Sequence, residues 1–311
     1  MKMNFKLKAL AAAAIMAVSA PSFAAMQGAT SGNGELIVNF VTTAGVSKVA
    51  GGDDWSAAFD LGVTMNDALS WNGVAGFTRT WNLDSGAMSG TGIVGSVSNS
   101  ANYGTVWSTL TSNAAAVGTT AANFEFNVIA LDNTDKTTVI GGSRYLTTAT
   151  SVFPSLTMAN LKGFDYMDSY VIANNALGTH GSVANGADLA TTANAMNSFF
   201  RLTGGLGGAA GDTWAAKTTA DTTKDLATAQ NFWFLTENGT ASVKTVFGVD
   251  LNANSSIGAG EYGLWTVSAA DHTITYTNPG VAAPVPEAST WAMLVAGLGM
   301  ISMMIRRRTN S

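Results

Sequence analysis

NFEFNVIAL, residues Asn123 to Leu131, is the stretch that most directly predicts the fold. Its aromatic residues Phe124 and Phe126 alternate with the polar residues Glu125 and Asn127. Successive side chains of a β-strand point to opposite faces of a sheet, so this period of two predicts a strand with one buried face. Such strands are typical of antiparallel sheets.

Similar short apolar segments recur along the chain and are separated by clusters of Gly, Asn, Asp, Ser and Thr. This punctuation is typical of antiparallel β proteins. We therefore expect a mainly β fold, an antiparallel sandwich- or barrel-like body. The other predicted strands are Leu36 to Val41, Ala58 to Met65, Gly76 to Leu83, Ser143 to Thr150, Asn231 to Thr236, Ala241 to Val249, Tyr262 to Ser268 and Thr273 to Thr277.

One or two short helices are expected within the β body. Residues Asp188 to Leu202 place apolar side chains such as Leu189 and Met196 on one side at helical spacing, and Asp188 could cap the first turn. Asn66 to Trp71 predicts a shorter helical turn.

The composition excludes several classes of protein. Of 311 residues, 47% are hydrophobic and 11% are charged, which favours a packed core over disorder. Residues 25 to 286 carry nine Lys and Arg against 19 Asp and Glu, so the body is acidic and lacks the basic clusters that nucleic-acid binding requires. The chain has no cysteine, which excludes disulfides, thiolate metal sites and cysteine nucleophiles.

The N-terminus predicts export. Three lysines precede an apolar stretch from Ala9 to Val18, and the small residues Ser22 and Ala24 occupy the −3 and −1 positions that a signal peptidase accepts. We therefore expect residues 1–24 to be a signal peptide, delivered by the general secretion machinery. The alternative, an amphipathic helix belonging to the fold, does not explain this three-part order.

The C-terminus predicts a linker followed by a membrane anchor. Residues 278–287 carry three of the five prolines and are therefore predicted to be a linker that contains the sorting motif. This linker would separate a β-rich extracytoplasmic body at 25–277 from a transmembrane helix and Arg-rich tail at 288–311. Trp291 to Ile305 has 15 uncharged residues, or roughly 22 Å of helix at ~1.5 Å per residue. This is short of the ~30 Å hydrocarbon core, but arginine snorkelling and local thinning could allow it to span.

The charges around the apolar run predict its orientation. Arg306, Arg307 and Arg308 follow it directly, and Trp291 begins it. The positive-inside rule places the arginines in the cytoplasm and the body in the periplasm, and a tryptophan suits the outer interface. A buried core helix is the alternative, in which three consecutive charges would be costly.

These C-terminal residues resemble a known family. Val285, Pro286 and Glu287, then Trp291, the apolar run and the three arginines, resemble the PEP-CTERM sorting signal of Gram-negative bacteria; the third motif position, usually proline, is Ala288. The resemblance implies cleavage by an exosortase after a transient stay in the inner membrane, and release to the cell surface or extracellular matrix. It also implies an association with exopolysaccharide and biofilm.

The histidines and carboxylates of the body give weak signals of catalysis. His180 and His272 are the two imidazoles, and neither follows a nucleophile elbow; His272 is expected in a hairpin turn. The pairs Asp53/Asp54 and Asp165/Asp168 have the composition of a glycosidase site, yet such pairs are common in turns. The glycine-rich segment Gly204 to Gly211 lacks the lysine of a phosphate loop. We expect no enzymatic activity.

One loop is a weak candidate for calcium. Asp250, Asn252, Asn254 and Glu261 occupy positions 1, 3, 5 and 12 of a calcium-like loop, but the glycine expected at position 6 is Ser255. The flanking residues are predicted strands instead of helices, so a plain Asx-rich hairpin loop without a metal is favoured.

The aromatic residues leave two functions open. Most of the eight tryptophans are expected in the core, and Trp55, Trp71 and Trp107, beside polar residues, are the first to be tested for exposure. The favoured function is a non-enzymatic, surface-sorted structural or interaction component of an exopolysaccharide or biofilm matrix. The alternative is a carbohydrate-binding or glycan-active envelope protein.

Overall fold

The computed structural model describes most of the body and little of either terminus. The described residues are 26, 32–42, 55–97, 100–116, 124–132, 144–149, 166–177, 186–191, 197–199, 223–238, 241–280, 298 and 300. The chain divides into two compact units, one ending at Pro279 and the other beginning at Gly280. The predicted signal peptide, residues 1–24, lies outside the described residues.

The first unit is built on one antiparallel sheet of 13 strands among the described residues. The order along its main path is β5-β4-β3-β13-β12-β10-β7-β6-β1-β2-β8, with β11 beside β10 and β9 beside β6. The strands are β1 (Glu35–Thr42), β2 (Ser56–Thr64), β3 (Thr78–Asn82), β4 (Ala87–Gly90), β5 (Ile93–Ser96), β6 (Phe124–Asp132), β7 (Arg144–Ala149), β8 (Ala187–Ala190), β9 (Lys224–Asp225), β10 (Gln230–Asn238), β11 (Ala241–Val246), β12 (Leu264–Ser268) and β13 (Thr273–Thr277).

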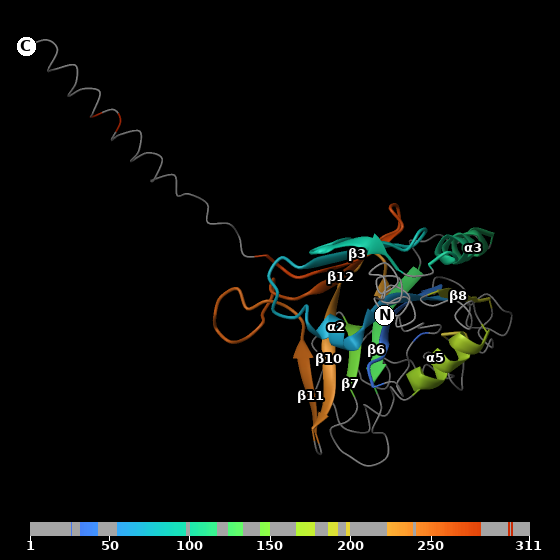
Figure 1. Ribbon diagram of the computed structural model, residues 1–311, viewed down its shortest axis with the longest axis horizontal. Helices are drawn as coiled ribbons and strands as arrows, with labels where there is room; N and C mark the ends of the chain where they lie inside the picture. The colour runs from blue at the N-terminus through green and yellow to red at the C-terminus, as the bar shows by residue number, and fades with distance from the viewer. Residues whose placement is uncertain are drawn as a thin grey trace, which may run out of the picture. The chain divides into compact units, whose positions relative to one another are not determined.

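The sheet is a curled half-barrel. In Figure 1, β6, β7, β10 and β11 run down the view, whereas β3 and β12 run across it, so the sheet turns strongly along its path. The mainly β, antiparallel class predicted from the sequence is confirmed. The barrel-like alternative describes it better than the sandwich does, because one continuous curled sheet forms the body.

Both faces of the central strands are buried. On the inner face, Phe40 of β1 lies opposite Phe126 of β6, and Val38 lies opposite Val128. On the outer face, Ile37 and its neighbours form a second apolar cluster. Burial on both faces explains why all eight residues of β1 are buried.

Three short helices lie among the described residues: α2 (Met65–Leu69), α3 (Tyr103–Ala116) and α5 (Tyr166–Leu177). Helix α3 packs against β2 and β8, and its Tyr103 and Trp107 rings make edge contacts with Phe59 and Phe40 of the inner face. Helix α5 contributes Tyr170 to the outer cluster. One or two helices were predicted, but only α2 matches a predicted segment, and α3 and α5 are additions.

The predicted helical turn at Asn66 to Trp71 is confirmed as α2. Thr64 caps it, because the Thr64 side chain accepts from the Asp67 backbone N–H while the Asp67 carboxylate accepts from the Thr64 backbone N–H. This reciprocal pair is a capping box, which satisfies two amides that have no partner within the helix.

The predicted helix at Asp188 to Leu202 is wrong in the part that the structure describes. Asp188 and Leu189 lie in β8, which pairs with Ser56–Phe59 of β2, and residues 191 and 197–199 are not helical. Pairing with an already buried strand outweighs a helical pattern of only a few apolar residues. Strands β4, β5, β8 and β9 were not predicted either.

The tryptophans singled out for exposure are buried. Trp55, Trp71 and Trp107 expose 8%, 3% and 1% of their surface. Their polar sequence neighbours misled the prediction, because neighbours in a strand or helix point in other directions. The broader expectation that most tryptophans form the core is confirmed by Trp81 and Trp265, which are fully buried.

The C-terminal end of the first unit is fixed to the body. Asn278 is buried, and its side chain accepts from the Tyr276 hydroxyl (2.6 Å) and donates to the Trp71 carbonyl (2.6 Å). The Pro279 carbonyl accepts from the Gly76 amide (3.0 Å). The first two residues of the predicted linker, 278–287, are therefore held by the body.

Little of the second unit is described. Leu298 and Met300 are helical and exposed, and both fall within the predicted membrane segment Trp291 to Ile305. In the parts of the chain that the structure describes, no helix is both long and apolar enough to cross a membrane. Most of residues 288–311 lies outside those parts.

Candidate functional site

A cleft of about 330 Å³ lies between two segments that are far apart in the sheet. One wall comes from β2 and α2, and the other comes from β3 and β4. The two walls are tied together beside the cleft, because the Trp81 indole N–H of β3 donates to the Leu61 carbonyl of β2 (3.0 Å). The lining residues are Gly62, Val63, Asp67, Ser70, Trp71, Arg79 and Met88.

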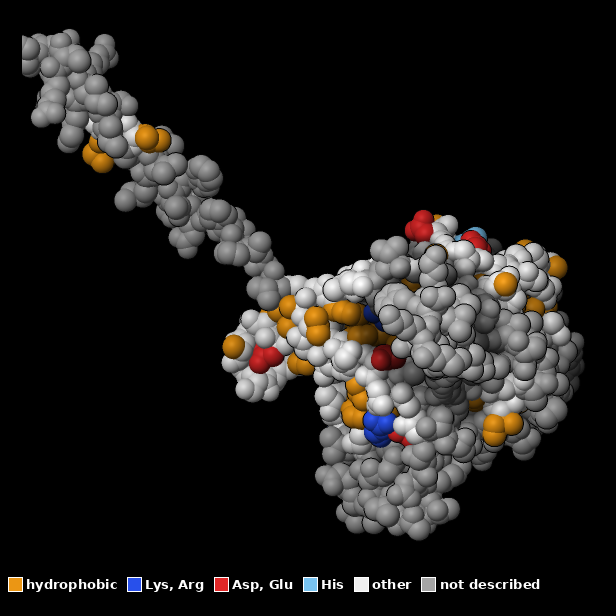
Figure 2. All heavy atoms as spheres, viewed as in Figure 1, with side chains coloured by type: hydrophobic (Ala, Val, Ile, Leu, Met, Phe, Trp, Pro, Cys, Tyr) orange, Lys and Arg blue, Asp and Glu red, His pale blue; other side chains and the backbone are white. Residues whose placement is uncertain are grey.

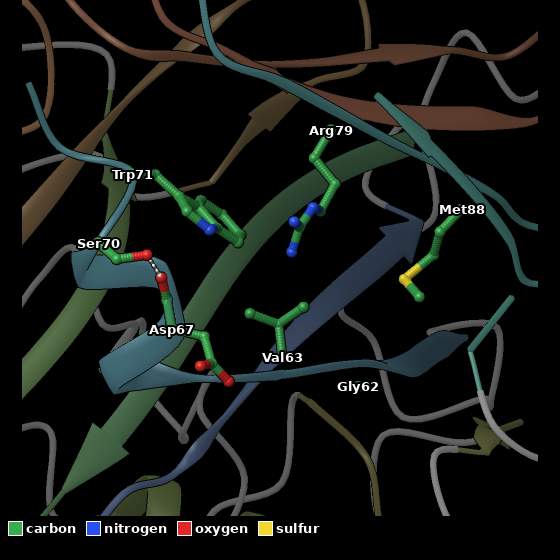
Figure 3. Close-up of a pocket in the computed structure, with 7 residues that line it drawn as sticks. All are labelled: Gly62, Val63, Asp67, Ser70, Trp71, Arg79 and Met88. Carbon is green, nitrogen blue, oxygen red and sulfur yellow. Dashed lines mark hydrogen bonds between the residues drawn. The ribbon is translucent and has the colours of Figure 1, made fainter. Parts of the chain in front are cut away.

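Arg79 is the central charged group of this cleft. Its side chain reaches from β3 between Trp71 and Met88 toward Val63 (Figure 3). The guanidinium carbon lies 5.1 Å from the Trp71 ring centroid and 5.4 Å from that of Phe77. These are cation–π distances, which hold the guanidinium over the aromatic faces.

The Arg79 guanidinium lacks the partners that a buried charge usually has. Arg79 is 8% exposed, and its Nε atom is buried without a hydrogen-bond partner. Among the described residues it forms no ion pair. Burial lowers the pKa of Arg79 from its usual value, and the charge of Asp67 opposes that shift.

The nearby carboxylate of Asp67 is engaged elsewhere. Its Oδ2 accepts from the Thr64 hydroxyl (2.7 Å) as part of the cap of α2. Ser70 follows the helix, and its hydroxyl donates to the Asp67 carbonyl (2.5 Å). Figure 3 shows the Asp67 carboxylate directed away from Arg79, so the helix cap fixes Asp67 near the cleft without neutralising the arginine.

Sequence reasoning missed Arg79, although a signal was present. In GFTRTWNL, Arg79 stands between Phe77 and Trp81 in the buried phase of the alternation. A charged residue at such a position requires either a partner or a ligand. The chemistry that this arrangement allows is the binding of an anion by a planar donor group in an apolar, aromatic cleft.

A second buried group missed by the sequence analysis lies on β2. Asp60 is fully buried, and its Oδ2 has no hydrogen-bond partner. Burial raises the pKa of Asp60 well above its ordinary value, and the neighbouring buried Glu35 raises it further. Gly62 donates its amide to Asp60 Oδ1 (2.9 Å), which opposes the shift.

Among the histidines and paired carboxylates from the sequence, only His272 and the backbone of Asp168 fall within the described residues. His272 lies in the turn between β12 and β13 with φ of 50°, and its Nδ1 is 2.8 Å from Asp84 Oδ2. Asp168 is in α5, but its side chain is not described. The other members of these sets, namely Asp53, Asp54, Asp165, His180 and the Gly204 to Gly211 segment, lie outside the described residues.

The loop that suggested calcium is closed by Asp250. The Asp250 carboxylate accepts from the backbone amides of Asn254 (3.1 Å) and Ser255 (2.7 Å). Ser255, where the calcium pattern expects glycine, has φ of 63° in the left-handed region. The Asn254 side chain in turn accepts from the Ser256 amide (2.9 Å).

Glu261 closes the same loop from its other end. Its carboxylate accepts from the Leu251 amide (3.0 Å), the Asn252 side-chain amide (2.7 Å) and the Gly258 amide (2.8 Å). Among the described residues, no group of three or more His, Asp or Glu side chains could hold a metal ion. The loop contacts are those of an Asx-rich turn.

The residues of the predicted sorting signal and the signal peptidase site lie outside the described structure. These are Val285, Pro286, Glu287, Trp291, Arg306, Arg307 and Arg308 at the C-terminus, and Ser22 and Ala24 at the N-terminus. On the face of the molecule in Figure 2, the charged side chains that are described are few.

Comparison with known proteins identifies the C-terminal segment. Residues 284–308 match the family model of the PEP-CTERM protein-sorting motif. No curated protein and no solved structure matches the chain. The resemblance drawn from the prolines, the apolar run and the arginines is thereby confirmed.

Proposed function

We propose that this chain, a protein with a PEP-CTERM sorting motif, is a surface-sorted structural or interaction component of the exopolysaccharide or biofilm matrix, and that it is not an enzyme. The single observation that carries the proposal is the motif at residues 284–308. The motif indicates export to the cell surface with an exosortase as the processing partner.

The division of the chain supports this proposal. The compact body ends at Pro279, where Asn278 and Pro279 are hydrogen-bonded to it, and the motif begins five residues later at Pro284. Cleavage near Pro286 and Glu287 would therefore remove the tail without touching any described strand. The chain would enter the periplasm through the general secretion machinery and stay in the inner membrane until it is cut.

The test changes the proposed recognition residues in the full chain, expressed in its own host. We expect Glu287→Ala to keep its C-terminal tail and to remain with the inner membrane, while the wild type loses the tail and reaches the surface. Ser289→Ala is the matched control, because it lies in the same segment outside the recognition core. Equal arrival of Glu287→Ala and the wild type at the surface would contradict the proposal.

The matrix role has its own test. Cells that lack the protein should shed more exopolysaccharide into the medium, and the wild-type gene should restore retention whereas Glu287→Ala should not. Restoration by Glu287→Ala would show that the role does not depend on sorting. The alternative of a glycan-active enzyme predicts instead that the purified protein shortens the host's own polysaccharide.

A further inference from the structure

We propose that the cleft around Arg79 is a binding site for the carboxylate group of a small acidic sugar. This inference concerns the body alone and does not depend on how the tail is processed.

The first argument is the free-energy cost of burying Arg79 without a hydrogen-bond acceptor for its Nε. Arg79 is 8% exposed, and its buried Nε has lost water without gaining a hydrogen bond. The two aromatic contacts with Trp71 and Phe77 offset only part of that loss. A bound anion would supply the missing acceptor.

The second argument is the shape of the donor. A guanidinium presents its N–H groups in a planar fork that matches the two oxygens of a carboxylate. Trp71 and Phe77 fix the plane of the fork before a ligand arrives, which reduces the entropy lost on binding. A singly charged carboxylate suits the cleft better than a doubly charged tetrahedral anion, because the charge of Asp67 is close enough to act on Arg79 and would repel the additional charge.

The third argument concerns the rest of the ligand. A volume of about 330 Å³ is at the small end of ligand sites and suits one monosaccharide unit. The wall opposite the Trp71 ring carries Val63 and Met88, while Asp67 and Ser70 add oxygen atoms on the α2 side. Apolar walls with a few oxygen acceptors suit the C–H and O–H groups of a sugar ring.

The position of the cleft supports a role for Arg79 in ligand binding instead of in holding the two walls together. Arg79 and Val63 come from β3 and β2, which are separated by six strands along the main path and meet here only because the sheet curls. The Trp81 to Leu61 hydrogen bond already ties the two walls. The arginine is therefore not required to join them.

The experiment is calorimetric titration of the full chain, purified in detergent, with D-glucuronate. D-Glucose is the matched ligand without the carboxylate, acetate carries the carboxylate without the ring, and sulfate is a tetrahedral anion. The variant Arg79→Met keeps the apolar stem and removes the guanidinium. Lys244→Met on β11 removes one positive charge outside the cleft and is the control for net charge.

We expect glucuronate to bind the wild type and Lys244→Met alike, and to bind Arg79→Met at least 10-fold more weakly. Glucose, acetate and sulfate should each bind the wild type at least 10-fold more weakly than glucuronate. Absence of glucuronate binding, equal binding by Arg79→Met, or binding of sulfate or acetate as tight as that of glucuronate would each overturn the assignment.

A stability measurement keeps the test valid if a variant misfolds. An arginine with a structural role would lower the melting temperature when replaced, whereas an arginine kept for a ligand is a buried charge whose replacement by Met relieves desolvation. We therefore expect Arg79→Met to melt at or above the temperature of the ligand-free wild type. A fall of more than about 4 °C, roughly 1 to 2 kcal/mol for a body of this size, would assign Arg79 to the fold instead.

Discussion

At the scale of single residues, buried carboxyl groups determine how the fold responds to pH. Asp60 is fully buried on β2, beside the buried Glu35 of β1. The pKa of Asp60 is raised above its unfolded value of about 3.9, first by burial and then by the charge of Glu35. The stability that this raised pKa contributes is fully present below about pH 4 and is lost as the pH rises through the folded pKa.

The variant Asp60→Asn tests this dependence. It retains an Oδ1 acceptor for the Gly62 amide and cannot ionise, so the loss of stability at high pH should disappear. We expect the melting temperature to rise by about 2 to 4 °C at pH 7.5, which is roughly 1 kcal/mol for a body of this size, and to change less at pH 4. Calorimetric scans between pH 4 and 8 measure the difference. A variant that is less stable than the wild type at pH 7.5 would show that the charged form is stabilised.

The sequence could reveal some residues of the candidate site, but it could not show that they lie together in the folded protein. Arg79 has a visible signal, because it occupies the buried phase of an alternating strand. Val63 and Met88 are ordinary apolar residues, and only the curl of the sheet places them opposite Arg79. The curl cannot be inferred from a single sequence, because it arises from twist that accumulates over many strands.

At the scale of elements, nine of the 13 described strands were predicted, whereas the longest described helix was not. NFEFNVIAL is β6, as its alternation predicted, but the expectation of one buried face was wrong because both faces of β6 are buried. In α3, Tyr103, Val106 and Trp107 are buried at helical spacing, yet Thr, Ser and Asn occupy six of the other 11 positions and favour turns. Packing against β2 and β8 holds this helix in spite of its weak propensity.

The dependence of α3 on packing gives the second prediction. We expect Trp107→Ala to lower the free energy of unfolding by about 3 kcal/mol, near the low end for a buried aromatic residue. The low end is expected because the Trp107 indole N–H is buried without a partner, and the substitution removes that cost as well. Chemical denaturation provides the measurement.

Ser108→Ala is the control for this prediction, since Ser108 is exposed on the same helix. Its effect should lie within about 0.5 kcal/mol of zero. A Trp107→Ala loss no larger than that of Ser108→Ala would mean that α3 is held by something other than its buried face.

The loop between Asp250 and Glu261 gives the third prediction. Both carboxylates already accept hydrogen bonds from amides of the loop, so the loop should be closed without a metal. We expect millimolar calcium chloride, compared with a chelator, to leave the melting temperature of the full chain unchanged. A rise with calcium that Asp250→Asn abolishes would restore the calcium interpretation of Asp250, Asn252, Asn254 and Glu261.

At the scale of the whole molecule, the folded body and the sorting motif occupy separate segments of the chain. The acidic body extends as one compact, hydrogen-bonded unit to Pro279, and the sorting motif at residues 284–308 follows as a separate segment. Terminal patterns were sufficient to predict the sorting motif, because such signals are linear and are read by other proteins in an extended or membrane-bound form. The activity of the body depends on its folded surface, so it could not be inferred from these linear patterns.

The measurement that tests sorting most directly is the mass of the mature protein recovered from the cell surface. The account predicts termini near Ala25 and near Glu287, so both the lysines of the first ten residues and Arg306, Arg307 and Arg308 should be absent. A surface form that still carries the three arginines would contradict exosortase processing, and with it the proposed function.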